Sequence, residues 1–267
     1  MRRIDTTLEV TQIIDVLPEG ATEPIRCSLE NGMTAVVKYM RNRFGQQVLI
    51  NELVGACIAD ELGLIIPEYG ICNISKQVIE SANDTEEING RNAGLGFFSL
   101  SYSSTVPLVS NLLPDIQTKQ TELLILFDHI VNNFDRHNGN ILLEMKSPAR
   151  LFFIDNSHII TQDKSIDIEK ELAPSNIIST VLLDKNKDIY DLLCYRVGYS
   201  EEILSSEATR IRSILSDTKL QEIKRLIPDC WIQSAEQAYV DNMFLVIQHR
   251  IAAISDICAM IIRERRR

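Results

Sequence analysis

The 267-residue sequence lacks the features that mark several large classes of protein. Its six cysteines contain no C-x-x-C pair, and most of them lie inside apolar runs. Such cysteines are typical of buried thiols in a reducing compartment. The N-terminal MRRIDTTLEV has no apolar core of the kind found in signal peptides, and no apolar run reaches the length of a membrane span. We therefore expect a cytoplasmic protein without a membrane span.

Basic residues are also in deficit. The 27 Lys and Arg residues against 37 Asp and Glu residues give a formal net charge of -10. Binding to a nucleic-acid backbone depends on clustered Lys and Arg, so we expect no direct nucleic-acid partner. The one basic cluster, RERRR at residues 263–267, is better explained as the solvated C-terminal end of a helix. The 45% of hydrophobic residues is enough for one large domain or two packed lobes.

The first part of the chain is rich in strand-forming residues. Short β-type runs separated by turns cover residues 8–38, and Asn31–Gly32 predicts a two-residue hairpin turn. We therefore expect the chain to open with an antiparallel sheet.

A turn within this region, PEGATEP, contains small residues whose backbone N–H groups could face the phosphates of a nucleotide. It is not a G-x-G-x-x-G loop, and an ordinary hairpin turn is the stronger explanation of it. Its candidate cofactor-binding residues are Gly20, Ala21 and Thr22.

Lys38 closes the strand-like run TAVVK. Residues 46–64 follow it with apolar residues at helical spacing and Gly63 near the end, which predicts a helix. In kinase folds, a lysine at such a strand end neutralises nucleotide phosphates and pairs with a helix glutamate. Glu52 and Glu61 are the candidate partners, and we favour Glu52. Without the loop described next, Lys38 would be explained better as an edge-strand lysine that prevents aggregation.

A polar loop flanked by apolar runs lies within residues 128–158. Asp135 and Asn140 are five residues apart in DRHNGN, and Asp155 follows the strand-like run RLFFI beyond an expected hairpin. On its own, D-x-x-x-x-N is a weak pattern, because loop Asp and Asn side chains often cap backbone groups. The three residues nevertheless have the order and spacing used for phosphoryl transfer in kinase folds.

That chemistry gives each residue type a role. Asp135 would orient or accept the proton of an attacking hydroxyl, and Asn140 with Asp155 would hold Mg²⁺, which prefers oxygen ligands. His137 is a second candidate for assisting proton transfer, because histidine side chains titrate near neutral pH, but a structural role explains it equally well. Arg136 could orient the loop through a carboxylate.

The motifs VVK, NEL, DRHNGN and IDNS occur in an order that resembles the HipA-like kinases, which carry an N-x-D-R-x-x-x-N loop and an I-D-x-S strand end. The loop is also similar to that of phosphoinositide kinases and actin-fragmin kinase, which have a histidine at the place of His137. The resemblance covers residues 11–160 loosely. Asn156 and Ser157 replace the F-G pair of ordinary protein kinases, and no A-P-E anchor follows, so any activation segment is short.

The resemblance implies an α+β fold of the two-lobed, protein-kinase-like type. A small antiparallel β lobe with one helix would precede a larger, mainly helical lobe. Residues 1–267 would then form a single HipA-like kinase domain, with residues 1–105 in the N-terminal lobe and residues 106–267 in the C-terminal lobe. The apolar stretch at residues 238–262 should be buried against the catalytic lobe or against a second subunit.

Three functions are compatible with these residues. The first is an ATP- and Mg²⁺-dependent kinase acting on a Ser or Thr hydroxyl of an unknown protein, with an antitoxin or other regulator as the partner that the resemblance implies. The second is a small-molecule or phosphoinositide kinase, although a net charge of -10 counts against work at anionic membranes. The third is a pseudokinase that binds nucleotide or a partner without transfer. We rank it last because all the metal-binding and proton-accepting groups are present.

Overall fold

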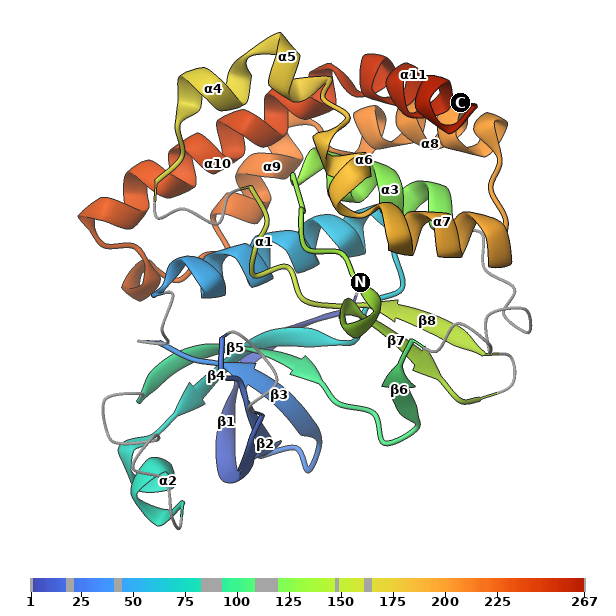
Figure 1. The fold of residues 1–267 in the computed structure, drawn as a ribbon. Coiled ribbons are helices and arrows are strands. Elements are labelled where there is room, and N and C mark those ends of the chain that lie inside the picture. Colours follow the sequence, from blue (N-terminus) through green and yellow to red (C-terminus); the bar gives the residue numbers. More distant parts are fainter. Residues whose placement is uncertain are drawn as a thin grey trace.

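The computed structural model describes residues 2–17, 22–40, 45–82, 93–108, 120–146, 149–160 and 165–266. Strands and helices are combined in an α+β fold (Figure 1). The strands are β1 (Arg3–Val16), β2 (Ile25–Leu29), β3 (Thr34–Lys38), β4 (Tyr69–Ile74), β5 (Gly94–Leu100), β6 (Thr105–Pro107), β7 (Ile141–Glu144) and β8 (Arg150–Phe153).

The helices are α1 (Gln47–Leu62), α2 (Lys76–Ser81), α3 (Thr121–Ile130), α4 (Ile168–Leu172), α5 (Pro174–Ile177), α6 (Val181–Lys185), α7 (Lys187–Arg196), α8 (Glu201–Ile214), α9 (Asp217–Lys224), α10 (Ser234–Ala252) and α11 (Ile254–Arg265). The described residues also form two 3₁₀ turns, η3 (Asn138–Asn140) and η4 (Asp229–Trp231).

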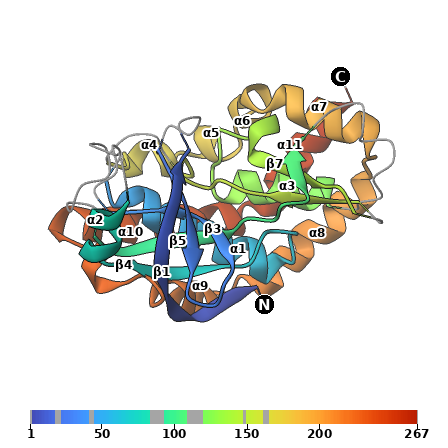
Figure 2. The ribbon, with the colours of Figure 1, turned by 90° about the horizontal axis from the view of Figure 1, so that it is seen from below.

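Strands β1 to β5 form a closed sheet in the order β1-β2-β3-β5-β4. Neighbouring strands are antiparallel except β1 and β4, which are parallel. Residues 3–9 of β1 pair with β4, and residues 10–16 pair with β2, with register shifts in both pairings (Figure 2). The prediction of a wholly antiparallel sheet is therefore wrong, because β1 and β4 are parallel. One long, irregular strand contacts two neighbours and makes the sheet mixed.

The hairpin predicted at Asn31–Gly32 is confirmed, but its connection is longer than two residues. β2 ends at Leu29 and β3 begins at Thr34, and the N–H of Leu29 donates to the carbonyl oxygen of Met33 (2.8 Å). β3 then runs between β2 and β5, and its last residue, Lys38, lies opposite Phe97. Lys38 is thus on an internal strand, so protection of a sheet edge does not explain it.

Helix α1 is buried on nearly all sides, as expected for a helix that is apolar all round. It ends at Gly63, whose φ of 77° is in the left-handed region and whose N–H donates to the carbonyl oxygens of Ala59 and Asp60. The helix predicted at residues 46–64 is therefore confirmed. In Figure 1, α1 lies between the sheet and the other helices.

The buried apolar residues that the structure describes form two clusters. The smaller one lies within the closed sheet and includes Val37 and Phe98. The larger one joins α1 to α3 and to the C-terminal helices, through residues such as Leu53, Phe127 and Trp231. Because α1 packs in the larger cluster, its side chains are held in fixed positions relative to the helical part of the chain.

The apolar stretch at residues 238–262 forms two helices instead of one. α10 ends at Ala252 and α11 begins at Ile254, with a bend of 65° between them. Their inward residues, including Met243, Ile247 and Ile257, belong to the larger cluster. The stretch is therefore buried within its own chain, as in the first of the two predicted alternatives. Among the residues that the structure describes, no single helix is long and apolar enough to cross a membrane.

The packing of α3 against α10 buries His129, which leads to a testable pH dependence. Its Nδ1 lies 2.8 Å from the carbonyl oxygen of Ile125, and its own carbonyl oxygen accepts a hydrogen bond from Arg250 Nη1 (3.0 Å). Burial, with a smaller contribution from the charge of Arg250, lowers the pKa of His129 from 6.5 to about 4. The unfolded chain therefore binds a proton more readily than the folded chain between these two pH values.

We expect the free energy of unfolding to decrease as the pH falls from 6.5 to 4, with His129 contributing up to about 3 kcal/mol of that loss. Urea denaturation at several pH values, on the wild type and on His129→Phe, measures this contribution. The variant should lose this part of the slope, because phenylalanine has no proton to bind. A variant with the same pH dependence as the wild type would contradict the prediction.

Candidate active site

Lys38 is the point at which the sheet, α1 and the segment after β8 meet. Its side chain is buried, forms an ion pair with Glu52 of α1, and forms a second one with Asp155, with 2.9 Å between Nζ and Oδ1. Glu61, the other candidate partner in the sequence, instead pairs with Lys219 of α9 (3.3 Å). The structure therefore places Lys38, Glu52 and Asp155 together, while their roles toward a nucleotide stay predictions.

Burial and neighbouring charges shift the pKa values of Lys38, Glu52 and Asp155 to different extents. Burial favours the neutral amine of Lys38, but the charges of Asp155 and Glu52 outweigh burial and raise the pKa of Lys38. Burial also opposes the ionisation of Asp155, yet Lys38 and the Ser157 hydroxyl hold the pKa of Asp155 below its ordinary range. Burial, only partly offset by Lys38, raises the pKa of Glu52 to about 7. The lowered pKa of Asp155 favours its ionised form, which is the form that binds a cation.

The loop after α3 carries Asp135 and Asn140. The N–H of Asp135 donates to Asn133 Oδ1 (3.0 Å), and Asn140 Nδ2 donates to the carbonyl oxygen of Asp135 (2.7 Å). This last bond fixes the amide of Asn140, so its Oδ1 points away from the loop backbone. Within the described residues, the Asp135 carboxylate has no hydrogen bond or ion pair, which leaves it available to an acceptor hydroxyl.

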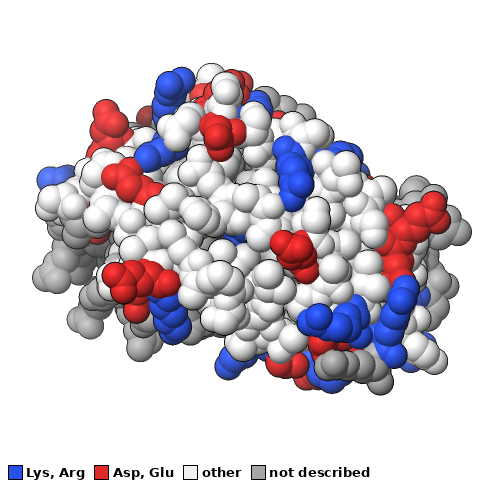
Figure 3. Space-filling model, turned by 90° about the horizontal axis from the view of Figure 1, so that it is seen from above, with Lys and Arg blue, Asp and Glu red and all other residues white. Residues whose placement is uncertain are grey.

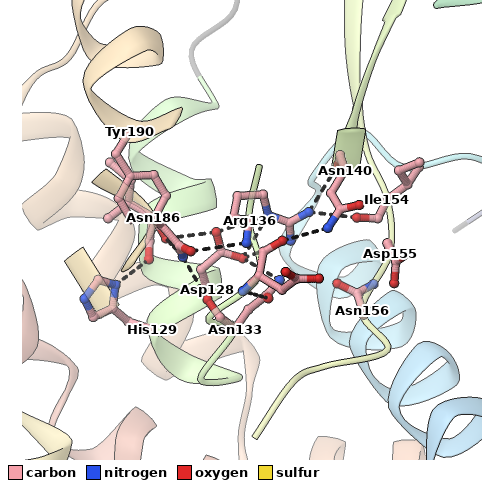
Figure 4. A network of polar contacts seen from close by, with 12 residues as sticks. Asp128, His129, Asn133, Arg136, Asn140, Ile154, Asp155, Asn156, Asn186 and Tyr190 are labelled. Carbon is pink, nitrogen blue, oxygen red and sulfur yellow. Dashed lines mark hydrogen bonds and ion pairs between the residues drawn. The ribbon is translucent and has the colours of Figure 1, made fainter. Parts of the chain in front are cut away.

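A buried ion pair between Arg136 and Asp128 supports this loop (Figure 4). Arg136 Nη2 lies 2.9 Å from Asp128 Oδ1, and both side chains are fully buried. Asp128 also accepts hydrogen bonds from Tyr190 (2.9 Å) and from Asn133 Nδ2 (3.2 Å). Asn186, between α6 and α7, accepts from the N–H of Arg136 (3.2 Å). The carboxylate expected to orient Arg136 is therefore Asp128, which satisfies the buried charge.

Arg136 also connects the two halves of the candidate metal site. Its Nη1 donates to the carbonyl oxygen of Asn140 (3.3 Å) and to that of Ile154 (2.8 Å), the residue before Asp155. A single rigid guanidinium group thus fixes the backbone at Asn140 and next to Asp155. Asp128, Asn186 and Tyr190 were not recognised from the sequence. The one available signal was a carboxylate, Asp128, inside the otherwise apolar run LLILFDHIV.

His137 is exposed and has a structural contact. Its Nδ1 accepts a hydrogen bond from the N–H of Gly139 (3.0 Å), which caps the 3₁₀ turn η3. This contact gives the structural alternative a geometric basis, and assistance in proton transfer stays a prediction. Of the three small residues proposed to face phosphates, Thr22 is buried, whereas Gly20 and Ala21 lie outside the described residues.

The segment after β8 rests directly on α1. The N–H of Asn156 donates to Glu52 Oε2 (3.1 Å), and the Asn156 side chain lies over Gly55. A Cβ atom added at Gly55 would lie 2.5 Å from the Asn156 Cβ, which is too close for two carbon atoms that are not bonded to each other. Gly55 is therefore required by the approach of the segment that contains Asp155, and not by the backbone of the helix.

We expect Gly55→Ala to lower the free energy of unfolding by about 1–3 kcal/mol and to weaken nucleotide binding, because Asn156 and with it Asp155 must move. Thermal denaturation and calorimetric ATP binding measure the two effects. Asn156→Gly in the same chain removes the clashing Cβ and should restore much of the stability, whereas Asn156→Ala keeps that atom and should not. Equal behaviour of the two double variants would contradict this explanation.

The donor set at the site fits a hard divalent cation. Among the described residues, no three His, Cys, Asp or Glu side chains form a cluster that could hold a metal by themselves. The available ligands are carboxylate and amide oxygens, Asp155 Oδ2 and Asn140 Oδ1. Mg²⁺ is commonly held by one or two such protein oxygens together with substrate phosphates, so these residues fit a metal that arrives with a nucleotide.

Solved structures of kinases share this fold. The crystal structure of the Helicobacter pylori proinflammatory kinase CtkA matches with a TM-score of 0.54 and 12% identity over 97% of this chain and 100% of that one. The Golgi casein kinase with Mn/ADP bound matches with a TM-score of 0.55 and 10% identity over 95% of this chain and 74% of that one. A search of curated proteins found no match. The chain therefore shares its fold with these two proteins.

Residues 10–256 match the family of HipA-like kinases. The match covers most of the 267 residues and includes every element described above from β2 to α10. The chain therefore belongs to the HipA-like kinases, and the resemblance seen in the motifs is confirmed.

Proposed function

We propose that the chain is an ATP- and Mg²⁺-dependent kinase that transfers the γ-phosphate to a Ser or Thr hydroxyl of a protein. The observation that carries the proposal is the contact of Lys38 with Asp155, which are 117 residues apart and meet at 2.9 Å. A lysine that binds phosphates and a carboxylate that binds the metal must lie near each other to act on one triphosphate. Family membership supports the same reaction class.

Each residue has a role that follows from its position. Lys38, held by Glu52, would bind the phosphates of ATP, and Asn140 with Asp155 would hold the metal. Bound Mg²⁺ would neutralise negative charge on the phosphate oxygens. Asp135, whose carboxylate makes no hydrogen bond or ion pair with the described residues, would orient the acceptor hydroxyl and take its proton. Such a site accelerates transfer mainly by positioning the reactants and by holding charged groups where they stabilise the charge of the transition state.

A protein acceptor is favoured over a phosphoinositide by the charge of the molecule. The net charge is -10, and the face in Figure 3 shows Lys and Arg side chains interspersed with acidic ones around a largely uncharged centre. Recognition of an anionic membrane surface calls for several clustered basic residues, and a net charge of -10 counts against such recognition. The Golgi casein kinase structure has Mn/ADP bound, which supports a nucleotide and a divalent metal as the ligands of this chain.

Two further features belong to the proposal. The chain would form one kinase domain, divided near residue 105, where the chain passes from the first sheet into β6 of the second. Family membership makes an antitoxin or other regulatory protein the expected partner, and a cytoplasmic site of action accords with the free cysteines.

The test is calorimetric binding of ATP with and without Mg²⁺, on the wild type and on Asp155→Ala, followed by transfer of labelled γ-phosphate to casein or to the chain itself. We expect binding to depend on the metal and Asp155→Ala to abolish that dependence. Asp241→Ala, an exposed residue paired with Lys224, is the control and should bind like the wild type. Binding without any transfer would favour a pseudokinase, and no binding of ATP would refute the proposal.

A further inference from the structure

One oxygen of Asp155 is surrounded by hydrogen-bond donors. Oδ1 accepts from Lys38 Nζ (2.9 Å), from the N–H of Ser157 (3.2 Å) and from the Ser157 hydroxyl. Asp155 itself has a φ of 59°, in the left-handed region that side chains other than glycine seldom adopt. The direction of the Asp155 carboxylate therefore depends on these three hydrogen bonds, and two of them come from Ser157.

Ser157 is in turn fixed to the helices. It is buried, and its carbonyl oxygen accepts from Asn51 Nδ2 of α1 (2.7 Å). Asn51 Oδ1 accepts from the hydroxyl of Tyr239 on α10 (2.8 Å). A chain of hydrogen bonds thus leads from α10 through α1 to Ser157 and then to Asp155, so Ser157 has a firm position from which to hold the carboxylate.

Lys38 is the donor that is expected to leave Asp155 in part when phosphates bind. The Ser157 contacts would remain, because neither group of Ser157 has a role toward the nucleotide in the proposed function. Ordinary protein kinases have the glycine of D-F-G at this place, and glycine has no hydroxyl to offer. The serine therefore supplies a contact that the more common motif lacks.

We propose that Ser157 is a positioning residue, which holds Oδ1 of Asp155 by its hydroxyl so that Oδ2 faces the metal of a metal–nucleotide complex. The inference rests on the proposed function, since it takes Asp155 as a metal ligand. It concerns the direction of that ligand and not the chemistry of transfer. Outer contacts of this kind commonly change metal affinity by about 10–100-fold when they are removed.

The test compares Ser157→Ala with Ser157→Thr in ATP binding, titrated with Mg²⁺ and with Mn²⁺ and also measured without metal. We expect Ser157→Ala to weaken the metal-dependent part of binding by about 10–100-fold and to leave metal-free binding unchanged. Ser157→Thr keeps the hydroxyl and should restore metal-dependent binding. Ser206→Ala, on the exposed side of α8, removes a hydroxyl that donates to the carbonyl oxygen of Ile203 in the same helix and should have no effect.

The outcomes separate this inference from the proposed function. Wild-type metal affinity in Ser157→Ala, or an equal loss with and without metal, would overturn the positioning role. Failure of threonine to restore binding would do the same. If the wild type binds metal and ATP but transfers no phosphate to any acceptor, the proposed function fails, while a selective metal defect in Ser157→Ala would still support the inference.

Discussion

Replacing Asp135 by asparagine should lower the rate of phosphoryl transfer by about 10²–10⁴-fold, without changing the binding of ATP and Mg²⁺. The side chains have nearly the same shape, but an amide cannot accept the proton of the acceptor hydroxyl. Because the Asp135 carboxylate makes no hydrogen bond or ion pair with the described part of the chain, the substitution removes no structural contact there. Transfer of labelled phosphate and calorimetric binding of ATP measure the two properties separately.

Asn138→Ala is the matched control, because Asn138 is exposed in the same loop three residues further on. It should retain most of the transfer activity. A rate for Asp135→Asn close to that of the wild type would exclude Asp135 as the proton acceptor. Loss of ATP binding in the variant would show instead that the residue acts on the ground state of the complex.

Replacing Asp128 by alanine should lower the free energy of unfolding by about 3–5 kcal/mol, because it leaves the charge of Arg136 buried without its partner. Arg136 and Asp128 are both fully buried, so water cannot replace the lost carboxylate. The same change frees the guanidinium group that fixes the backbone at Asn140 and Ile154. We therefore expect metal-dependent ATP binding to be weakened in the fraction of the variant that folds.

Thermal and urea denaturation measure the stability of this variant. Asp191→Ala is the control, since Asp191 forms ion pairs with Lys187 and Arg265 but is about half exposed. Exposed ion pairs contribute about 0–1 kcal/mol, so this control should be nearly as stable as the wild type. Equal stability of the two variants would mean that the buried pair does not support the loop.

The candidate site could be predicted from the sequence where its members are close along the chain. Asp135 and Asn140 belong to one loop, and the bond from Asn140 to the carbonyl oxygen of Asp135 is local. Glu52 could be favoured over Glu61 on a family motif, and the structure pairs it with Lys38. The hydrogen bonds around Asp128 could not be predicted. Tyr190 is 62 residues from Asp128 in the chain, and no local sequence pattern indicates that contact.

The fold shows the same division. Alternation of apolar and polar residues predicted strands, and apolar spacing predicted α1 and the burial of residues 238–262. The parallel pairing of β1 with β4 and the bend of 65° between α10 and α11 were not predicted. Both depend on which surfaces must be covered by distant parts of the chain, and a hydrophobic pattern states only that a residue is buried, not by what.

The sequence by itself determined the family, the reaction class and the identity of the candidate residues, because a short loop and a strand end fix the types and spacing of the groups that phosphoryl transfer needs. The tertiary structure decided how those groups are held. Only packing brings Lys38, Glu52 and Asp155 together and fixes the Ser157 backbone to α1 through Asn51. Charges buried away from water need partners with defined geometry, and such partners are set by the fold.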